Sequence, residues 1–237
     1  MLGWVIICFS NCLSAKDLRV ATAANFKATL ERIVSQYQHT GGADRVAIIT
    51  ASSGVLFTQI RHGAPFDIFL SADASKPLQL AAQHPSDSFV YAIGRLAFWA
   101  PGQTRVDRQS LLAFQSRLAI ANPRVAPYGA AAIESLRQLK PGFNELVLGK
   151  NINQAFQFVE SGNAAAGLIA LSQLTQAAND AYWLIPETLH RPIEQRGILL
   201  NLDSRGAADF VAFLQSPMAR VEIARSGYEL PVSAAHH

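Results

Sequence analysis

Residues 18–42 read LRVATAANFKATLERIVSQYQHTGG, and the fold class follows from this segment. The mostly apolar run Leu18–Ala23 predicts a buried strand. After it, apolar residues recur at helical spacing up to the glycine pair at 41–42: Phe26, Leu30, Ile33, Val34 and Tyr37. A strand that leads directly into an amphipathic helix is the first half of a βαβ unit, so the segment favours an α/β fold.

The same alternation of short apolar runs and amphipathic stretches continues along the chain. Further strands are predicted at residues 46–50, 66–70, 89–99, 118–121, 146–148, 166–171, 182–185 and 193–201. The runs 89–99 and 193–201 are the long ones, and each is long enough to pass from one lobe into another as an extended crossover. The sequence therefore predicts lobes with these bounds: a discontinuous lobe I at 16–95 plus 199–231, lobe II at 96–198, and a tail at 232–237.

Composition indicates an ordinary globular protein. The chain has 237 residues, of which 50% are hydrophobic and 16% charged, so it can bury a large core. Its formal net charge is only +3, and the lysines and arginines are scattered rather than clustered. Nucleic-acid binding needs a basic patch or stripe, so we expect no nucleic-acid partner.

The first fifteen residues predict a signal peptide. They carry no charge, hold an apolar run too short to cross a bilayer, and end in the small residues Ser14 and Ala15. The positive start of such a peptide is missing, which leaves two alternatives: a true start upstream of Met1, or a buried first strand. Both cysteines, Cys8 and Cys12, lie here, so the mature chain would have no disulfide and no thiolate metal site. A lipid anchor at Cys12 is disfavoured, because residues 9–11 lack the usual aliphatic and small residues.

Four predicted junctions run from a strand or loop directly into a helix, with small or hydrogen-bonding residues at the turn. They are AAN (23–25), ASSG (51–54), APYG (126–129) and KNIN (150–153). A helix start offers unpaired N–H groups and a partial positive charge, so several starts that converge would bind an anion without any lysine or arginine. Taken alone, each junction is better explained by an N-cap that satisfies its own helix.

Other chemistry-bearing residues point to no active site. The six histidines show no metal-ligand spacing, and no Gly-x-Ser-x-Gly motif or recognisable histidine would make Ser52 or Ser53 a nucleophile. Asp67 and Asp73 are interpreted as turn, cap or packing residues rather than as a general acid and base. We therefore expect a binding protein, not an enzyme, with no cofactor.

Six motifs, in order along nearly the whole chain after residue 16, resemble the periplasmic molybdate-binding proteins of ABC transporters. They are TAANF (22–26), ASSG (51–54), GAPFDIFLSAD (63–73), YAIG (91–94), ANPRVAPYG (121–129) and GY (227–228). The resemblance implies a type II periplasmic-binding-protein fold, in which two α/β lobes joined by two crossover strands close over an anion. It also implies export to the periplasm, a membrane permease as partner, and a monomer.

The resemblance assigns four residues to the anion site. Asn25 and Ser53 would bind from lobe I by side chain and backbone N–H, Tyr128 would bind from lobe II, and Ile152 would contribute its backbone N–H. The chain departs from the family at two places. Ala170 stands where one branch has a tyrosine, for which Tyr128 would compensate, and Ala24 stands where the nearest relatives have a threonine.

The expected ligand is molybdate or tungstate. Both are dianions without protons near neutral pH and can only accept hydrogen bonds, whereas phosphate keeps a proton that a carboxylate normally accepts. None of the four junctions contains Asp or Glu. Sulfate differs from molybdate in size, so a receptor for sulfate or another tetrahedral oxyanion stays open as an alternative. A regulator's ligand-sensing domain is less favoured, because no helix-turn-helix module precedes Leu18.

Overall fold

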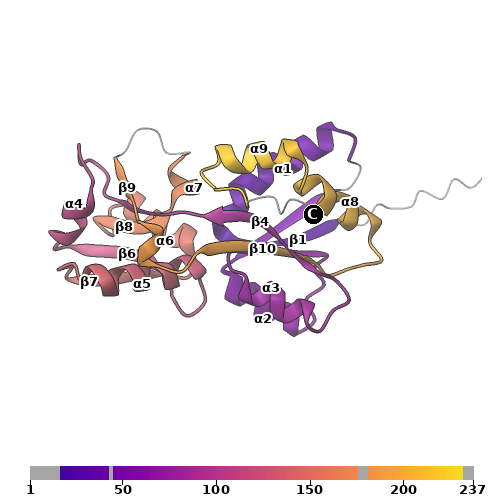
Figure 1. Ribbon diagram of the computed structural model, residues 1–237, viewed down its shortest axis with the longest axis horizontal. Coiled ribbons are helices and arrows are strands. Elements are labelled where there is room, and N and C mark those ends of the chain that lie inside the picture. The colour runs from indigo at the N-terminus through magenta and orange to yellow at the C-terminus, as the bar shows by residue number, and fades with distance from the viewer. Residues whose placement is uncertain (1–16, 43–44, 176–180, 232–237) are drawn as a thin grey trace, which may run out of the picture.

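The computed structural model describes residues 17–42, 45–175 and 181–231. Their strands form two five-stranded sheets, one in each of two lobes that lie side by side along the longest axis of the molecule (Figure 1). The predicted signal peptide at 1–15 and the tail at 232–237 lie outside the described residues. Within the described part, no helix is long and apolar enough to cross a membrane.

The sheet of the first lobe has the strand order β2-β1-β3-β10-β4. Its strands are β1 (Leu18–Ala23), β2 (Val46–Ala51), β3 (Ile68–Ser71), β4 (Ser88–Gly94) and β10 (Ile193–Leu199). β1 pairs in parallel with both β2 and β3, whereas β10 is antiparallel to β3 and β4. The parallel pairs confirm the βαβ pattern expected from residues 18–51, and β10 makes the sheet mixed.

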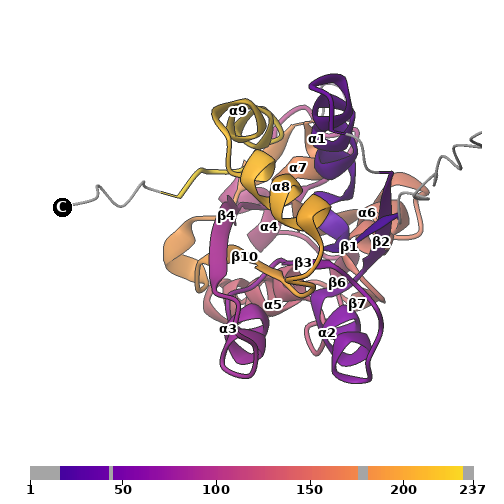
Figure 2. The same ribbon diagram turned by 90° about the vertical axis from the view of Figure 1, so that its right-hand side faces the viewer.

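Helices cover both faces of this sheet (Figure 2). They are η1 (Ala24–Phe26), α1 (Lys27–His39), α2 (Ser53–Arg61), α3 (Ser75–Ala81), α8 (Arg205–Leu214) and α9 (Pro217–Arg225). Figure 2 shows α1, α8 and α9 on one face, and α2 and α3 on the other. The predicted helical face is confirmed, because all five of its apolar residues are buried: Phe26, Leu30, Ile33, Val34 and Tyr37.

The second lobe repeats the plan with the strand order β7-β6-β8-β5-β9. Its strands are β5 (Leu96–Trp99), β6 (Arg117–Ala121), β7 (Glu145–Gly149), β8 (Ala166–Ala170) and β9 (Tyr182–Leu184). Its helices are α4 (Arg108–Leu112), α5 (Pro127–Leu139), α6 (Ile152–Glu160), α7 (Leu171–Leu174) and η2 (Glu187–Leu189). β6 is parallel to β7 and β8, so α5 and α6 begin at the carboxyl ends of neighbouring strands.

The chain passes between the lobes twice. The predicted run 89–99 is in fact two strands, since β4 lies in the first sheet and β5 in the second, with the crossing at Gly94-Arg95. The second crossing differs from our expectation. β10 pairs along its whole length with β3 and β4, so the chain re-enters the first lobe at Ile193 rather than at 199. Two α/β lobes joined by two crossings are otherwise as predicted.

Candidate anion-binding site between the lobes

A small pocket lies between the lobes, and all four residues predicted for the site line it. Asn25 and Ser53 belong to the first lobe, and Tyr128 and Ile152 to the second. The rest of the wall consists of Ala23, Ala24, Ser52, Ala72, Ala126, Pro127 and Asn151. The cavity volume is about 10 Å³. That is about the room that one water molecule needs, so only a very small ligand could fit and a larger one would need the lobes to move apart slightly.

The start of α2 supplies the first-lobe wall. Ser53 is fully buried, and its Oγ accepts a hydrogen bond from Ala72 N at 2.9 Å. The hydroxyl hydrogen of Ser53 is therefore left to donate. Ser52 precedes the helix as N-cap, and its buried Oγ finds no hydrogen-bond partner among the described residues. Ser52 was missed as a site residue, although the repeated serine of the ASSG motif is a signal for it.

The starts of α5 and α6 supply the second-lobe wall. The Asn151 side chain caps α6 by accepting from Gln154 N at 3.0 Å. The N–H of Ile152, the first residue of α6, has no partner inside its own helix. Tyr128 follows Pro127, which opens α5 and has no N–H of its own. Ile152 is thus placed to donate from its backbone, as the resemblance implies.

Asn25 is placed differently from our expectation. Its Nδ2 donates to Gln195 Oε1 at 3.0 Å and to the Tyr228 hydroxyl at 3.1 Å, which uses both amide hydrogens. A side-chain hydrogen bond from Nδ2 to a ligand is therefore ruled out in this arrangement. Asn25 is the second residue of η1, so its backbone N–H is the donor that it can offer to the pocket.

A buried polar network lies behind the pocket. Gln195 is fully buried, and it accepts from the Tyr91 hydroxyl at 2.9 Å and donates Nε2 to the Tyr128 hydroxyl at 3.2 Å. Burial raises the pKa of both Tyr91 and Tyr128 well above the ordinary tyrosine value, because ionisation would leave a charge in a dry interior. Both hydroxyls therefore stay protonated. Gln195 is a residue that the sequence analysis missed.

The lobes are in contact across the pocket. Gly54 N, in α2, donates to Val125 O of the second lobe at 2.9 Å, and Ser172 Oγ of the second lobe donates to Asn25 O at 3.3 Å. A Cβ on Gly54 would lie 2.9 Å from Val125 O and 3.0 Å from Val125 Cα, so only glycine fits. Most of the pocket-lining residues are buried in this arrangement.

The electrostatics of the pocket favour an anion. None of the residues that line it, all in the described part of the chain, carries a charged side chain. Instead, η1, α2, α5 and α6 begin at residues that line it, and the unpaired N–H groups and positive dipole ends of helix starts favour an anion. Neutral donors in a water-poor site bind an anion more strongly than the same donors in water.

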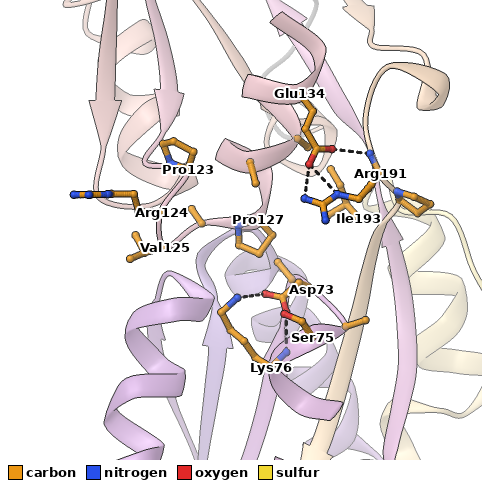
Figure 3. Close-up of a pocket in the computed structure, with 16 residues that line it drawn as sticks. Asp73, Ser75, Lys76, Pro123, Arg124, Val125, Pro127, Glu134, Arg191 and Ile193 are labelled. Carbon is orange, nitrogen blue, oxygen red and sulfur yellow. Dashed lines mark hydrogen bonds and ion pairs between the residues drawn. The ribbon is translucent and has the colours of Figure 1, made fainter. Parts of the chain in front are cut away.

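A larger pocket opens beside the small one and shares Ala72, Ala126 and Pro127 with it. Figure 3 shows two ion pairs in its wall, one from each lobe. Lys76 Nζ lies 2.6 Å from Asp73 Oδ2, and Arg191 Nε lies 2.8 Å from Glu134 Oε1. Lys76 and Arg191 are thus each paired with a carboxylate, whereas Arg124, which also lines this pocket, forms no ion pair with any described residue.

The two aspartates that we interpreted as structural do have structural partners. Asp67 accepts from Arg19 N at 2.8 Å and from Asn201 Nδ2 at 2.7 Å, which ties together segments at both ends of the first lobe. Asp73 accepts from Lys76 N at 3.0 Å at the start of α3. Neither aspartate lines the small pocket.

The two departures from the family pattern have different surroundings. Ala24 lines the pocket, so a hydroxyl that a threonine would bring there is absent. Ala170 is fully buried at the end of β8 and does not line the pocket, whereas Tyr128 does. Of the two positions, therefore, only 128 faces the pocket.

The family model for bacterial extracellular solute-binding proteins matches residues 18–229. The molybdate-binding protein ModA of Rhodobacter capsulatus is 37% identical over 227 residues, which cover 91% of this chain and 89% of that protein. ModA of Azotobacter vinelandii is 37% identical over 231 residues, which cover 91% of each chain. The solved structure of the periplasmic molybdate-binding protein of Azotobacter vinelandii superposes with a TM-score of 0.79 at 32% identity and covers 91% of this chain and all of that one. The expected two-lobed binding-protein fold of type II is thereby confirmed.

Proposed function

Because this chain belongs to the family of bacterial extracellular solute-binding proteins, we propose that it captures molybdate in the pocket between its lobes and delivers it to an ABC permease. Tungstate, which has nearly the same size and charge, is the second ligand. The protein acts as a monomeric periplasmic receptor, performs no chemistry on the anion and needs no cofactor. Residues 1–15 serve as its signal peptide.

The observation that carries this proposal is a small pocket between the lobes whose wall combines helix starts from both lobes with no charged side chain. The donors to the dianion are the backbone N–H groups of Asn25 and Ile152 and the hydroxyls of Ser53 and Tyr128. Ser52, whose buried hydroxyl is unpartnered among the described residues, is a further donor. Because the donors come from both lobes, a bound anion holds the lobes together.

Ligand-induced stabilisation tests the proposal. A ligand that binds only the native state raises the midpoint of thermal unfolding, so at micromolar ligand concentrations the mature protein should respond to molybdate and tungstate, whereas sulfate, phosphate and chromate bind too weakly to give a shift. Chromate is the informative control, because it has the same shape and charge as molybdate but a smaller radius. A larger response to sulfate or phosphate would overturn the substrate and leave the fold untouched.

A further inference from the structure

Gln195 lies where the two lobes meet, although it does not line the pocket itself. It belongs to β10, its side chain is fully buried, and its amide contacts pocket residues of both lobes. Gln195 Oε1 accepts from Asn25 Nδ2 at 3.0 Å, and Gln195 Nε2 donates to the Tyr128 hydroxyl at 3.2 Å. The position therefore links the two sides of the pocket through one amide group.

Two backbone carbonyls act on the hydrogen bonds of this network. Asn25 O faces the Tyr228 hydroxyl, and Ser71 O faces the Tyr91 hydroxyl at 3.1 Å, although the shorter contact of Tyr91, 2.9 Å, is with Gln195 Oε1. Asn25 O can only accept, so the Tyr228 hydroxyl, 2.8 Å away, donates its single hydrogen to this oxygen. Tyr228 must then accept from the Asn25 amide at 3.1 Å, which orients Nδ2 rather than Oδ1 toward both Tyr228 and Gln195. Gln195 consequently presents Oε1 to Asn25 and Nε2 to Tyr128.

This orientation restricts the Tyr128 hydroxyl. A phenol oxygen that accepts from an amide still carries one hydrogen, and that hydrogen has to be donated elsewhere. In the described part of the chain, no residue accepts it. Gly94 makes the close approach possible, since a Cβ there would collide with the Tyr128 hydroxyl and lie 2.8 Å from Gln195 Nε2.

We propose that Gln195 is a specificity-determining positioning residue: by donating to Tyr128, it commits the Tyr128 hydroxyl to donate into the pocket. An oxyanion without protons accepts this hydrogen bond. If the oxygen that faces Tyr128 carries a proton, both groups are donors and no hydrogen bond forms between them. Such a mismatch leaves buried polar groups unpaired and is costly. The inference rests on the proposed function, because it concerns the same anion site.

Sulfate and hydrogen phosphate provide the test. At mildly alkaline pH both are dianions of similar size, and they differ in one proton. Their affinities are measured by competition against bound molybdate, in the wild-type protein and in Gln195→Met, which keeps the side-chain volume but removes both the donor and the acceptor. We expect the preference for sulfate over hydrogen phosphate to fall by about tenfold in the variant, the size of one net hydrogen bond. An unchanged preference in a folded variant would overturn the inference.

Tyr91→Phe is the matched control. It removes another hydrogen bond to the same Gln195 amide but leaves the one between Gln195 and Tyr128. General damage to the buried network would lower the sulfate preference in Tyr91→Phe as well, and that result would also overturn the inference. We expect this variant to keep the wild-type preference.

Tyr128→Phe keeps the test decisive should Gln195→Met fail to fold. It removes the hydroxyl itself and should abolish the same preference, and combining it with Gln195→Met should have no further effect on selectivity. A wild-type preference in Tyr128→Phe would contradict the inference. Failure of the proposed function is distinguishable, because the wild-type protein would then show no tight binding of molybdate in the first place.

Discussion

At the scale of single residues, two pocket hydroxyls are left to act as hydrogen-bond donors because each already accepts a hydrogen bond from within the protein. Ser53 Oγ accepts from Ala72 N, and the Tyr128 hydroxyl accepts from Gln195 Nε2. Each hydroxyl is left with one hydrogen and no need for a further donor. A dianion that can only accept hydrogen bonds matches both of them.

Ser53→Ala should weaken molybdate binding by about 1–3 kcal/mol, because it removes a donor to the ligand and leaves Ala72 N–H without its acceptor. Isothermal titration calorimetry measures the loss. Ser135→Ala is the control, since Ser135 is equally buried in α5 but, among the described residues, its hydroxyl bonds only to Ala131 O. Unchanged affinity in Ser53→Ala would remove Ser53 from the site.

Gly94→Ala should weaken molybdate binding by about 1–3 kcal/mol, the usual penalty for adding a methyl group to a filled space. The new Cβ would displace the Tyr128 hydroxyl and Gln195 Nε2. Molybdate titrations of Gly94→Ala and of the control Gly142→Ala, where a Cβ meets nothing within 4 Å, separate the effect of the collision from that of the added methyl group. Equal affinities of the two variants would show that Tyr128 does not depend on this close approach.

At the scale of elements, α2 contacts the second lobe directly, through the hydrogen bond from Gly54 N to Val125 O. Gly54→Ala should hinder closure, because its Cβ would lie 2.9 Å from Val125 O across the interface. We expect binding weaker by about 1–3 kcal/mol and a smaller ligand-induced decrease in the radius of gyration, measured by small-angle X-ray scattering. The ligand-free variant should unfold like the wild type, since the contact forms between lobes; a large loss of ligand-free stability would contradict this explanation.

The helix starts around the pocket can be predicted from the sequence, and the partners of β10 cannot. A serine or asparagine after an apolar run marks an N-cap wherever it occurs, so the starts of α2 and α6 are local signals. The apolar run at 193–201 predicts a strand but carries no information about its neighbours. Our boundary at 199 was wrong for that reason.

Gln195 and the side chain of Asn25 show the same limit within the site. Gln195 lies between Glu194 and Arg196 on an alternating strand, a pattern that gives no sign that its side chain is fully buried. Its burial arises from Asn25, Tyr91 and Tyr128, which come from distant parts of the chain. The hydrogen bonds of Asn25 Nδ2 depend on these tertiary contacts, so the sequence points to Asn25 but does not show how its side chain is held.

At the scale of the whole molecule, buried tyrosines between the lobes link stability to pH. Burial raises the pKa of Tyr228 from 10.0 to about 12. In the unfolded chain this hydroxyl ionises near its ordinary pKa, while the folded protein keeps it neutral, so ionisation favours unfolding. The corresponding stability is present in full below pH 10 and is lost as the pH rises through about 12.

We therefore expect the free energy of unfolding to fall above pH 10, with Tyr228 alone accounting for roughly 2–3 kcal/mol. Denaturant titrations across this pH range measure it, and tyrosinate absorbance shows whether ionisation accompanies unfolding. In Tyr228→Phe, unfolding should release about one proton fewer, so the free energy of unfolding should fall less steeply with pH. A flat stability curve would mean that these hydroxyls titrate alike in the folded and unfolded chain.

The double crossing also fixes the order in which the molecule can be completed. β10 lies between β3 and β4, yet it is the last strand of the first sheet along the chain. A ribosome thus has to synthesise the entire second lobe before the first lobe receives a central strand, and such long-range pairing is slow. A polypeptide ending at Pro192 lacks β10, so its residues 18–51 should show little amide protection by hydrogen exchange. Native-like protection there would indicate that the first lobe folds without β10.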